Sequence, residues 1–183
     1  MLDSELIALL GNEIDAAVRV SYPLMTDFEV MQGAQPTQEG TPSVPTIILL
    51  KVHDRPRGWP MTSYARNQAG LFQESLVQLV ETTCNVSSLF WQDPTKPDDQ
   101  VVTAADLLNS VMLQFLFPSK IQELMTKGVN ILRVTDVTNE PFENDDHRFE
   151  FHPTFEIVFT HSRVAAKTTP FISTIDGEII PVI

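Results

Sequence analysis

The sequence lacks features that define several common classes of protein. Cys84 is the only cysteine in 183 residues, so no disulfide can form within the chain and nothing indicates an oxidising compartment. No apolar run approaches the ~20 residues that a membrane helix needs. The first residues carry Asp3 and Glu5 instead of the basic leader of a signal or import sequence. We therefore expect a protein without a membrane span that folds in a cytoplasm.

Basic residues are scarce. The chain has 12 Lys and Arg against 24 Asp and Glu, a formal net charge of −12. Binding to phosphates requires clustered positive charge, so tight binding to nucleic acid is not expected. Plain solubility is the commoner reason for such a charge, although an acidic surface would also repel DNA.

Sequence motifs of catalysis are also missing. There is no Gly-rich phosphate loop, nucleophile elbow, cysteine pair or helical His–Glu metal motif. His147 and His152, with Asp145, Asp146 and Glu150, could form a metal site, but solvated residues at strand ends are the favoured interpretation. The acidic run Glu140, Glu143, Asp145 and Asp146 could offer paired carboxylates for acid–base chemistry, but it lacks apolar neighbours that would raise a carboxylate pKa, so a solvated loop is favoured. We expect no enzyme and no cofactor, and a buried, unreactive Cys84.

Apolar residues recur at helical spacing in two places. The first is residues 3–21, where Asp3 or Ser4 can cap the helix. The second begins at Thr103, which forms a capping box with Asp106. Pro118 ends that helix, and Ser119 is expected to cap a short helix that finishes at Gly128.

Four segments have the composition of strands: residues 46–52, about 75–91, 129–137 and 148–158. The last alternates most clearly, with one face formed by Phe149, Phe151, Phe155, Ile157 and Phe159. Such alternation indicates an antiparallel sheet with one face on a core. Pro153 cannot donate a ladder hydrogen bond, so it marks a bulge or an edge.

Segments rich in proline, glycine and polar residues separate these elements. Residues 31–45 predict an extended loop, either a plain surface loop or a binding arm. Residues 53–60 break the first strand and begin a long loop that holds Trp59 and Tyr64. Residues 139–146 predict a polar turn. Residues 175–183 are expected to form either a hairpin or a strand given to a neighbour.

Strands and helices are segregated along the chain, which predicts an α+β fold. The sheet is expected to be mostly antiparallel and four-stranded or larger, with the helices packed on one face. A single domain covers residues 1–183: an N-terminal helix (3–21), an extended loop (31–45), the sheet and helix pair (46–165) and a C-terminal arm (166–183).

Two groups of residues are candidates for contact with a partner. Arg55, Arg57 and Arg66 interleave with Trp59 and Tyr64, a mixture that suits single-stranded nucleic acid or a subunit interface. The acidic total favours the interface. The second group is the polar face of the alternating strand: Arg148, Glu150, His152 and Glu156.

Several stretches together resemble the tail or neck terminator proteins of tailed bacteriophages. They are the N-terminal helix, GAQPTQEGTPSVPTIILLKV, VETTCNVSSLFW, AADLLNSVMLQF, GVNILRVTDVTN and HRFEFHPTFEIVFTH. The resemblance covers roughly residues 3–165 and rests on the order and spacing of these elements.

The resemblance implies a structural virion protein that assembles, in the host cytoplasm, into a six-membered homo-oligomeric ring. The ring would cap the tail tube, join it to neck or connector proteins and, in contractile tails, meet the sheath. DNA would pass through an acidic lumen without specific binding. The loop that holds Gln35 would be one contact arm. The alternatives are another head–tail joining or tail-completion protein and, less favoured, a small metal-binding enzyme.

Overall fold

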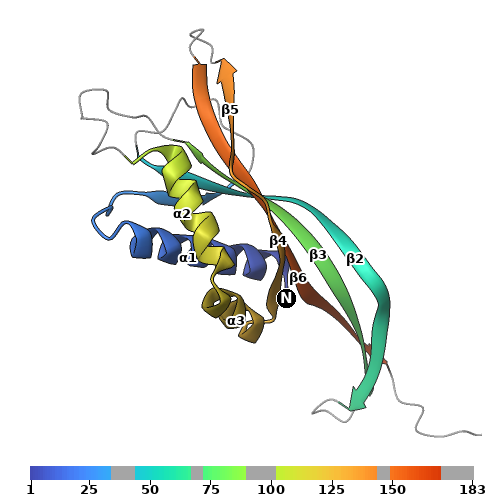
Figure 1. Cartoon of the computed structure of the whole chain (residues 1–183). Helices are drawn as coiled ribbons and strands as arrows, with labels where there is room; N and C mark the ends of the chain where they lie inside the picture. Colours follow the sequence, from blue (N-terminus) through green and yellow to red (C-terminus); the bar gives the residue numbers. More distant parts are fainter. Residues whose placement is uncertain (34–43, 67–71, 90–101, 144–148, 170–183) are drawn as a thin grey trace, which may run out of the picture.

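The structure is a computed structural model that describes residues 1–33, 44–66, 72–89, 102–143 and 149–169. These ranges contain three helices and six strands (Figure 1). In chain order they are α1 (Asp3–Ser21), β1 (Glu29–Gln32), β2 (Thr46–Arg66), β3 (Phe72–Leu89), α2 (Ala104–Leu116), α3 (Pro118–Thr126), β4 (Val129–Val134), β5 (Thr138–Glu143) and β6 (Phe149–Thr169).

The strands form one sheet in the order β1-β2-β3-β6-β4, and β5 pairs with β6 beyond the end of β4. Only β1 and β2 run parallel; the other pairs are antiparallel. All three helices lie on the same face of the sheet (Figure 1). The prediction of an α+β fold with a mostly antiparallel sheet and helices on one face is confirmed.

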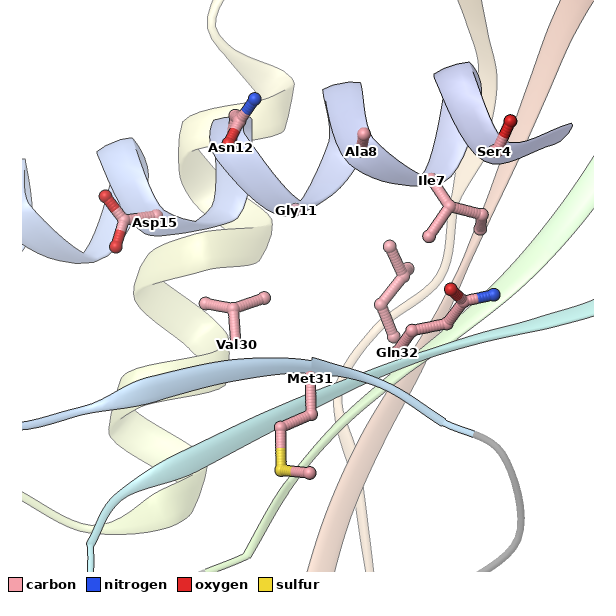
Figure 2. A pocket seen from close by; sticks show the side chains of 10 residues that line it. Ser4, Ile7, Ala8, Gly11, Asn12, Asp15, Val30, Met31 and Gln32 are labelled. Carbon is pink, nitrogen blue, oxygen red and sulfur yellow. The ribbon is translucent and has the colours of Figure 1, made fainter. Parts of the chain in front are cut away.

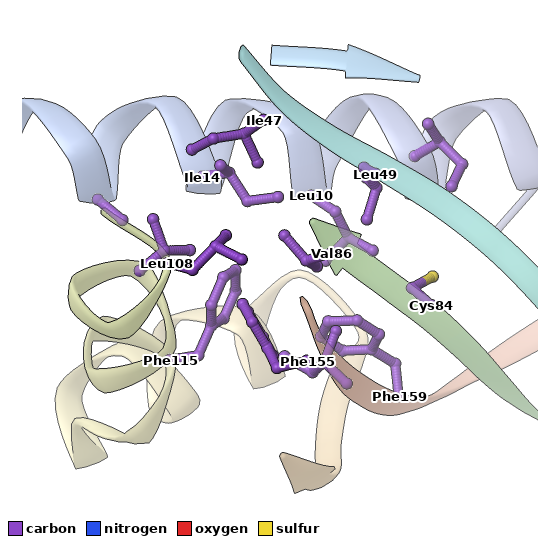
Figure 3. Close-up of a cluster of buried hydrophobic side chains, with 14 of the residues drawn as sticks. Leu10, Ile14, Ile47, Leu49, Cys84, Val86, Leu108, Phe115, Phe155 and Phe159 are labelled. Atoms are coloured by element: carbon purple, nitrogen blue, oxygen red, sulfur yellow. The ribbon is translucent and has the colours of Figure 1, made fainter. Parts of the chain in front are cut away.

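The core fills the space between the helices and this face (Figure 3). Phe155, Ile157 and Phe159 of β6 are all buried, as the alternation predicted. Phe159 meets Phe115 of α2 edge to face, with ring centroids 6.3 Å apart. Burial of each such side chain contributes about 1.5–3 kcal/mol, so this contact layer is what holds α2 on the sheet.

The helix boundaries follow the sequence closely, but two of the caps differ. The Thr103 hydroxyl accepts a hydrogen bond from the Asp106 N–H at 3.0 Å, so the predicted capping box is confirmed. At α1, Glu5 accepts from the N–H of Leu2, and the expected cap by Asp3 or Ser4 is wrong. Helix α3 begins at Pro118, whose fixed φ and missing N–H suit the first helical position. Its N-cap is Phe117, so the expected cap by Ser119 is wrong.

The largest departure from the sequence prediction is β2. Residues 53–60 were expected to break the strand, yet β2 continues to Arg66. Two irregularities in the pairing accommodate the proline and glycine residues of this segment. The register with β3 shifts between Lys51 and His53 and again between Arg57 and Met61. Beyond Leu49, β2 is paired only with β3 in the described part of the chain, and an edge strand tolerates proline.

Four smaller expectations are also corrected. Residues 138–143 form β5 instead of a polar turn, because their backbone pairs with β6. The strand predicted at 129–137 ends at Val134. Residues 166–169 belong to β6, so the C-terminal arm does not begin at 166. Residues 31–32 likewise lie in β1 instead of the predicted loop.

Several predictions fall outside the residues that the structure describes. They concern Gln35 and most of the 31–45 loop, His147 and Arg148 before β6, and the tail at 175–183.

Candidate interaction surface

Part of the sheet extends beyond the helices. Residues 57–66 of β2, 72–79 of β3 and 162–169 of β6 form a three-stranded ribbon that projects from the helix-covered core (Figure 1). We call these three segments the ribbon. Among the described residues, the outer edge of β2 has no partner strand after Leu49. The outer edge of β6 has none after His161. A partner chain could therefore approach both faces and both edges.

The ribbon presents Trp59 on a bulge. Two extra residues of β2 are accommodated between Arg57 and Met61, and Gly58 there adopts a φ of +67°, which favours glycine. The side-chain amide of Gln78 donates to the Arg57 carbonyl at 2.8 Å, which fixes the bulge to β3. Trp59 is 95% exposed on this supported turn. A large rigid aromatic side chain held in this way is typical of an anchor in a protein interface.

Apolar side chains cross the ribbon on the face away from the helices. Met61, Val77 and Val164 are opposite one another on the three strands, and Leu79 follows on β3. Met61 is 67% exposed and Val164 54% exposed. Sequence reasoning missed this row, because the alternation of β3 predicts which residues share a face but not where the helices stop covering the other one.

The predicted cluster around Trp59 is only partly brought together. By register, Arg55 and Arg57 lie on the same face as Met61, whereas Tyr64 lies opposite Glu74 on the other face. The Arg57 guanidinium donates to Glu81 at 2.5 Å. The Tyr64 hydroxyl donates to Glu74 at 3.2 Å, and the charge of Glu74 raises the pKa of Tyr64.

The second candidate group lies toward the other end of β6. Glu150 pairs by register with Phe142 of β5. His152 is half-buried, and this burial lowers its pKa, so it is not the freely solvated side chain that was expected. Glu156 is partly exposed and faces Arg133 at 3.8 Å. The two predicted groups are thus distinct surfaces at opposite ends of the sheet.

A hydrogen-bonded group of a threonine, a histidine and an aspartate invites comparison with a catalytic site. The Thr82 hydroxyl donates to Asp54 at 2.7 Å and lies 3.1 Å from Nε2 of His161. Both Thr82 and His161 are buried, and the hydroxyl proton is already committed to a carboxylate. No substrate atom can approach such a hydroxyl, so the arrangement stabilises the fold and lacks the geometry of a nucleophile–base pair.

Other reactive groups are similarly constrained. Burial raises the pKa of the Cys84 thiol to about 12, so the thiolate is not populated near neutral pH. In the described ranges, no three His, Cys, Asp or Glu side chains come together as a metal site would require. Within the same ranges, no helix has both the length and the apolar character needed to cross a bilayer.

The described surface therefore offers contact sites for proteins: exposed aromatic and aliphatic side chains on a ribbon with free edges. This defines the class as a structural assembly subunit. Residues 5–171 match a family model described as E217 gateway protein gp29, and the chain belongs to that family. The predicted phage tail or neck terminator family is confirmed by this match, and the chain is a structural virion protein and not an enzyme.

Other comparisons add little. One similar solved structure is the sheath/tube terminator of an extracellular contractile injection system, PVC, in the extended state. It shares 11% identity, with a TM-score of 0.39, over 93% of this chain and 63% of that chain. The chain thus spans less than two thirds of that protein's length. No curated protein sequence matches the chain significantly.

Proposed function

We propose that this chain forms a six-membered ring that closes the end of a phage tail tube and joins it to the neck or connector. The observation that carries the proposal is the family match over residues 5–171. The ring assembles from free subunits in the host cytoplasm and contacts tube protein on one side and neck proteins on the other. In a contractile tail it also contacts the last ring of the sheath.

The ribbon supports this proposal with a surface for head-to-tail contacts. A closed ring needs two different patches on each subunit that bind one another. Trp59 and the row of Met61, Val77 and Val164 supply one apolar patch on the ribbon. The second group around Glu150, His152 and Glu156 is far from it along β6 and is the candidate for the other side.

The acidic charge fits a ring through which DNA passes. With a net charge of −12 per subunit, a lumen lined by carboxylates repels phosphate and lets the duplex slide. Duplex DNA is accordingly not retained by the ring at about 0.1 M salt. Retention in an electrophoretic mobility assay would contradict this part of the proposal.

The test is assembly of the full chain. Native mass spectrometry and negative-stain electron microscopy would be run on the protein alone and after mixing with tube protein. We expect sixfold rings, free or at tube ends. A chain that stays monomeric in both conditions overturns the ring. Rings that bind neck proteins but never tube ends favour a head–tail joining role.

A further inference from the structure

A groove runs between α1 and β1, the edge strand of the sheet (Figure 2). Its volume is about 450 Å³ and it opens to solvent. On the helix side the groove is lined by Ser4, Ile7, Ala8, Gly11, Asn12 and Asp15, and on the sheet side by Val30, Met31, Gln32 and Leu49.

The floor of this groove is an open strand edge. The N–H of Glu29 donates to Pro45 and the N–H of Gly33 donates to Leu49, so the amides of residues 29, 31 and 33 point toward β2. Backbone groups alternate along a strand, and those of Val30 and Gln32 therefore point away from β2. In the described residues β1 has no partner other than β2. An added strand would pair with these free groups.

Above the edge, α1 leaves room for side chains of that strand. A Cβ at Gly11 would meet no atom within 4 Å. Glycine in a helix costs about 1 kcal/mol relative to alanine, and packing among the described residues does not require it here. Half-buried Val30 provides an apolar contact on the sheet side, whereas exposed Met31 points away from α1 (Figure 2). The groove thus has room for the side chains of an extended segment from outside the described residues.

The sequence supplies one such segment in residues 178–183, EIIPVI, which follow β6. Added at an edge, this segment would itself become the edge strand, where Pro181 is tolerated. The first residues of the segment cannot reach the groove of their own chain. Thr169 is level with Phe72, and Leu49 beside the groove is level with Val86, which is about 46 Å away along β3. Glu178 lies nine residues beyond Thr169, a reach of at most about 32 Å.

We propose that the groove between α1 and β1 receives residues 178–183 of a neighbouring copy, paired as an added strand on β1. The inference rests on the proposed ring, to which it adds an exchange of arms around the circle. Each copy donates one arm and accepts one, so the contact is heterologous and closes with the ring.

Disulfide trapping in the full chain tests the contact directly. Cys84 is buried with a raised pKa and gives no background. Chains with Gln32→Cys and chains with Ile180→Cys would be mixed, assembled and oxidised. We expect a cross-linked dimer of the two. Leu132→Cys, exposed on β4 at the opposite edge of the sheet, is the matched control and should not cross-link to Ile180→Cys. Cross-linking to position 132 instead of 32, or rings without the 32–180 bond, overturns the inference.

A peptide assay tests the groove without the ring. A fluorescent peptide of residues 173–183 would be titrated against the full chain carrying Ile180→Asp, whose own arm cannot compete. We expect saturable binding, weakened at least tenfold by Gly11→Phe and unchanged by Gly11→Ala. No binding, or equal binding to both Gly11 variants, overturns the inference. If the peptide binds a chain that never forms rings, only the proposed ring is overturned. If a tube-protein segment binds in place of the peptide, the groove has a different occupant and the inference is overturned.

Discussion

Side chains with reactive chemistry take structural roles in this protein because of where the sheet places them. Cys84, Thr82 and His161 all lie on the face of the sheet that the helices cover, and each is buried. Burial lowers the pKa of His161 and raises that of Cys84, so both are held neutral near pH 7. All three side chains are therefore part of the packed core.

The thiol provides a simple measurement of this burial. In the native protein at pH 8, Cys84 should react with a thiol reagent at least 100-fold more slowly than a free cysteine, because the thiolate is not populated and the sulfur is enclosed. In denaturing urea the reaction should become fast. Rapid native labelling without unfolding would contradict the described packing.

Trp59 is the residue from which we expect the largest effect on assembly. Trp59→Ala should weaken subunit association by about 2 kcal/mol or more, roughly 30-fold, as for a central aromatic anchor. The melting temperature of the monomer should not change, since the side chain is 95% exposed. Leu24→Ala is the control, because Leu24 is equally exposed but lies outside the ribbon. Sedimentation equilibrium measures the association of both variants. Equal association of the two would exclude Trp59 from the interface.

At the scale of elements, an ion cluster joins helices that are distant in sequence. Glu13 of α1 accepts from Lys120 of α3 at 2.7 Å and from Lys127, the C-cap residue of α3, at 2.6 Å. Burial opposes the ionisation of Glu13, but the two lysines outweigh it and lower its pKa. Both lysines also pair with Glu123 of α3. The cluster fixes α3 against α1 where few apolar contacts do so.

Removal of the Glu13 carboxylate should show that this cluster contributes more to stability than an ordinary surface ion pair. Glu13→Ala should lower the free energy of unfolding by about 1–3 kcal/mol, because it deprives two lysines of a partly buried partner. Asp15→Ala, which removes only the exposed pair with Arg19, should cost less than about 0.5 kcal/mol. Urea denaturation measures both. Equal costs would show that the cluster is no stronger than a surface pair.

At the scale of the whole molecule, a second cluster ties the start of the chain to the sheet. Asp54 of β2 accepts from Lys51 at 2.6 Å and from Arg163 of β6 at 2.8 Å, and the same two cations contact Asp3. The N-terminal amine donates to the Ser162 carbonyl at 2.8 Å. Helix α1 is thereby fixed at the point where the ribbon leaves the core.

This cluster should govern stability in acid. Burial opposes the ionisation of Asp54, but hydrogen bonds from Lys51, Thr82 and Arg163 lower its pKa from 3.8 to about 2. A lowered pKa contributes stability that is present above about pH 4 and lost as pH falls toward 2. Asp54→Asn should therefore remove about 2 kcal/mol at pH 7 and flatten the decline between pH 4 and 2. Urea midpoints at several pH values test this; parallel curves for the two proteins would contradict it.

The net charge makes a prediction about assembly itself. Subunits of −12 repel one another, and salt screens that repulsion over a Debye length that shortens from about 14 to 4 Å between 50 and 500 mM. If the contacts are apolar, as on the ribbon, added salt should strengthen ring formation. Mass photometry across this range measures the ring fraction. A fall with salt would indicate contacts dominated by opposite charges.

Local patterns in the sequence were sufficient for several parts of the fold. The apolar spacing predicted α1 at residues 3–21, and the capping box placed the start of α2 after Thr103. The phenylalanine alternation correctly assigned Phe155 and Phe159 to the core. These features depend on side-chain periodicity and short-range hydrogen bonds, which neighbouring residues determine.

Tertiary pairing decided the rest. Pro56, Gly58 and Pro60 predict a break, but bulges and a free edge let β2 continue through them, and the ribbon exists for that reason. Residues 138–143 are mostly polar, yet they form β5 because their backbone pairs with the edge of β6. The sequence by itself determined which residues could be core and which class of assembly protein this is. Only the structure decided which surfaces the helices leave uncovered. That depends on how far strands that are distant in the sequence extend beyond the helices packed on them.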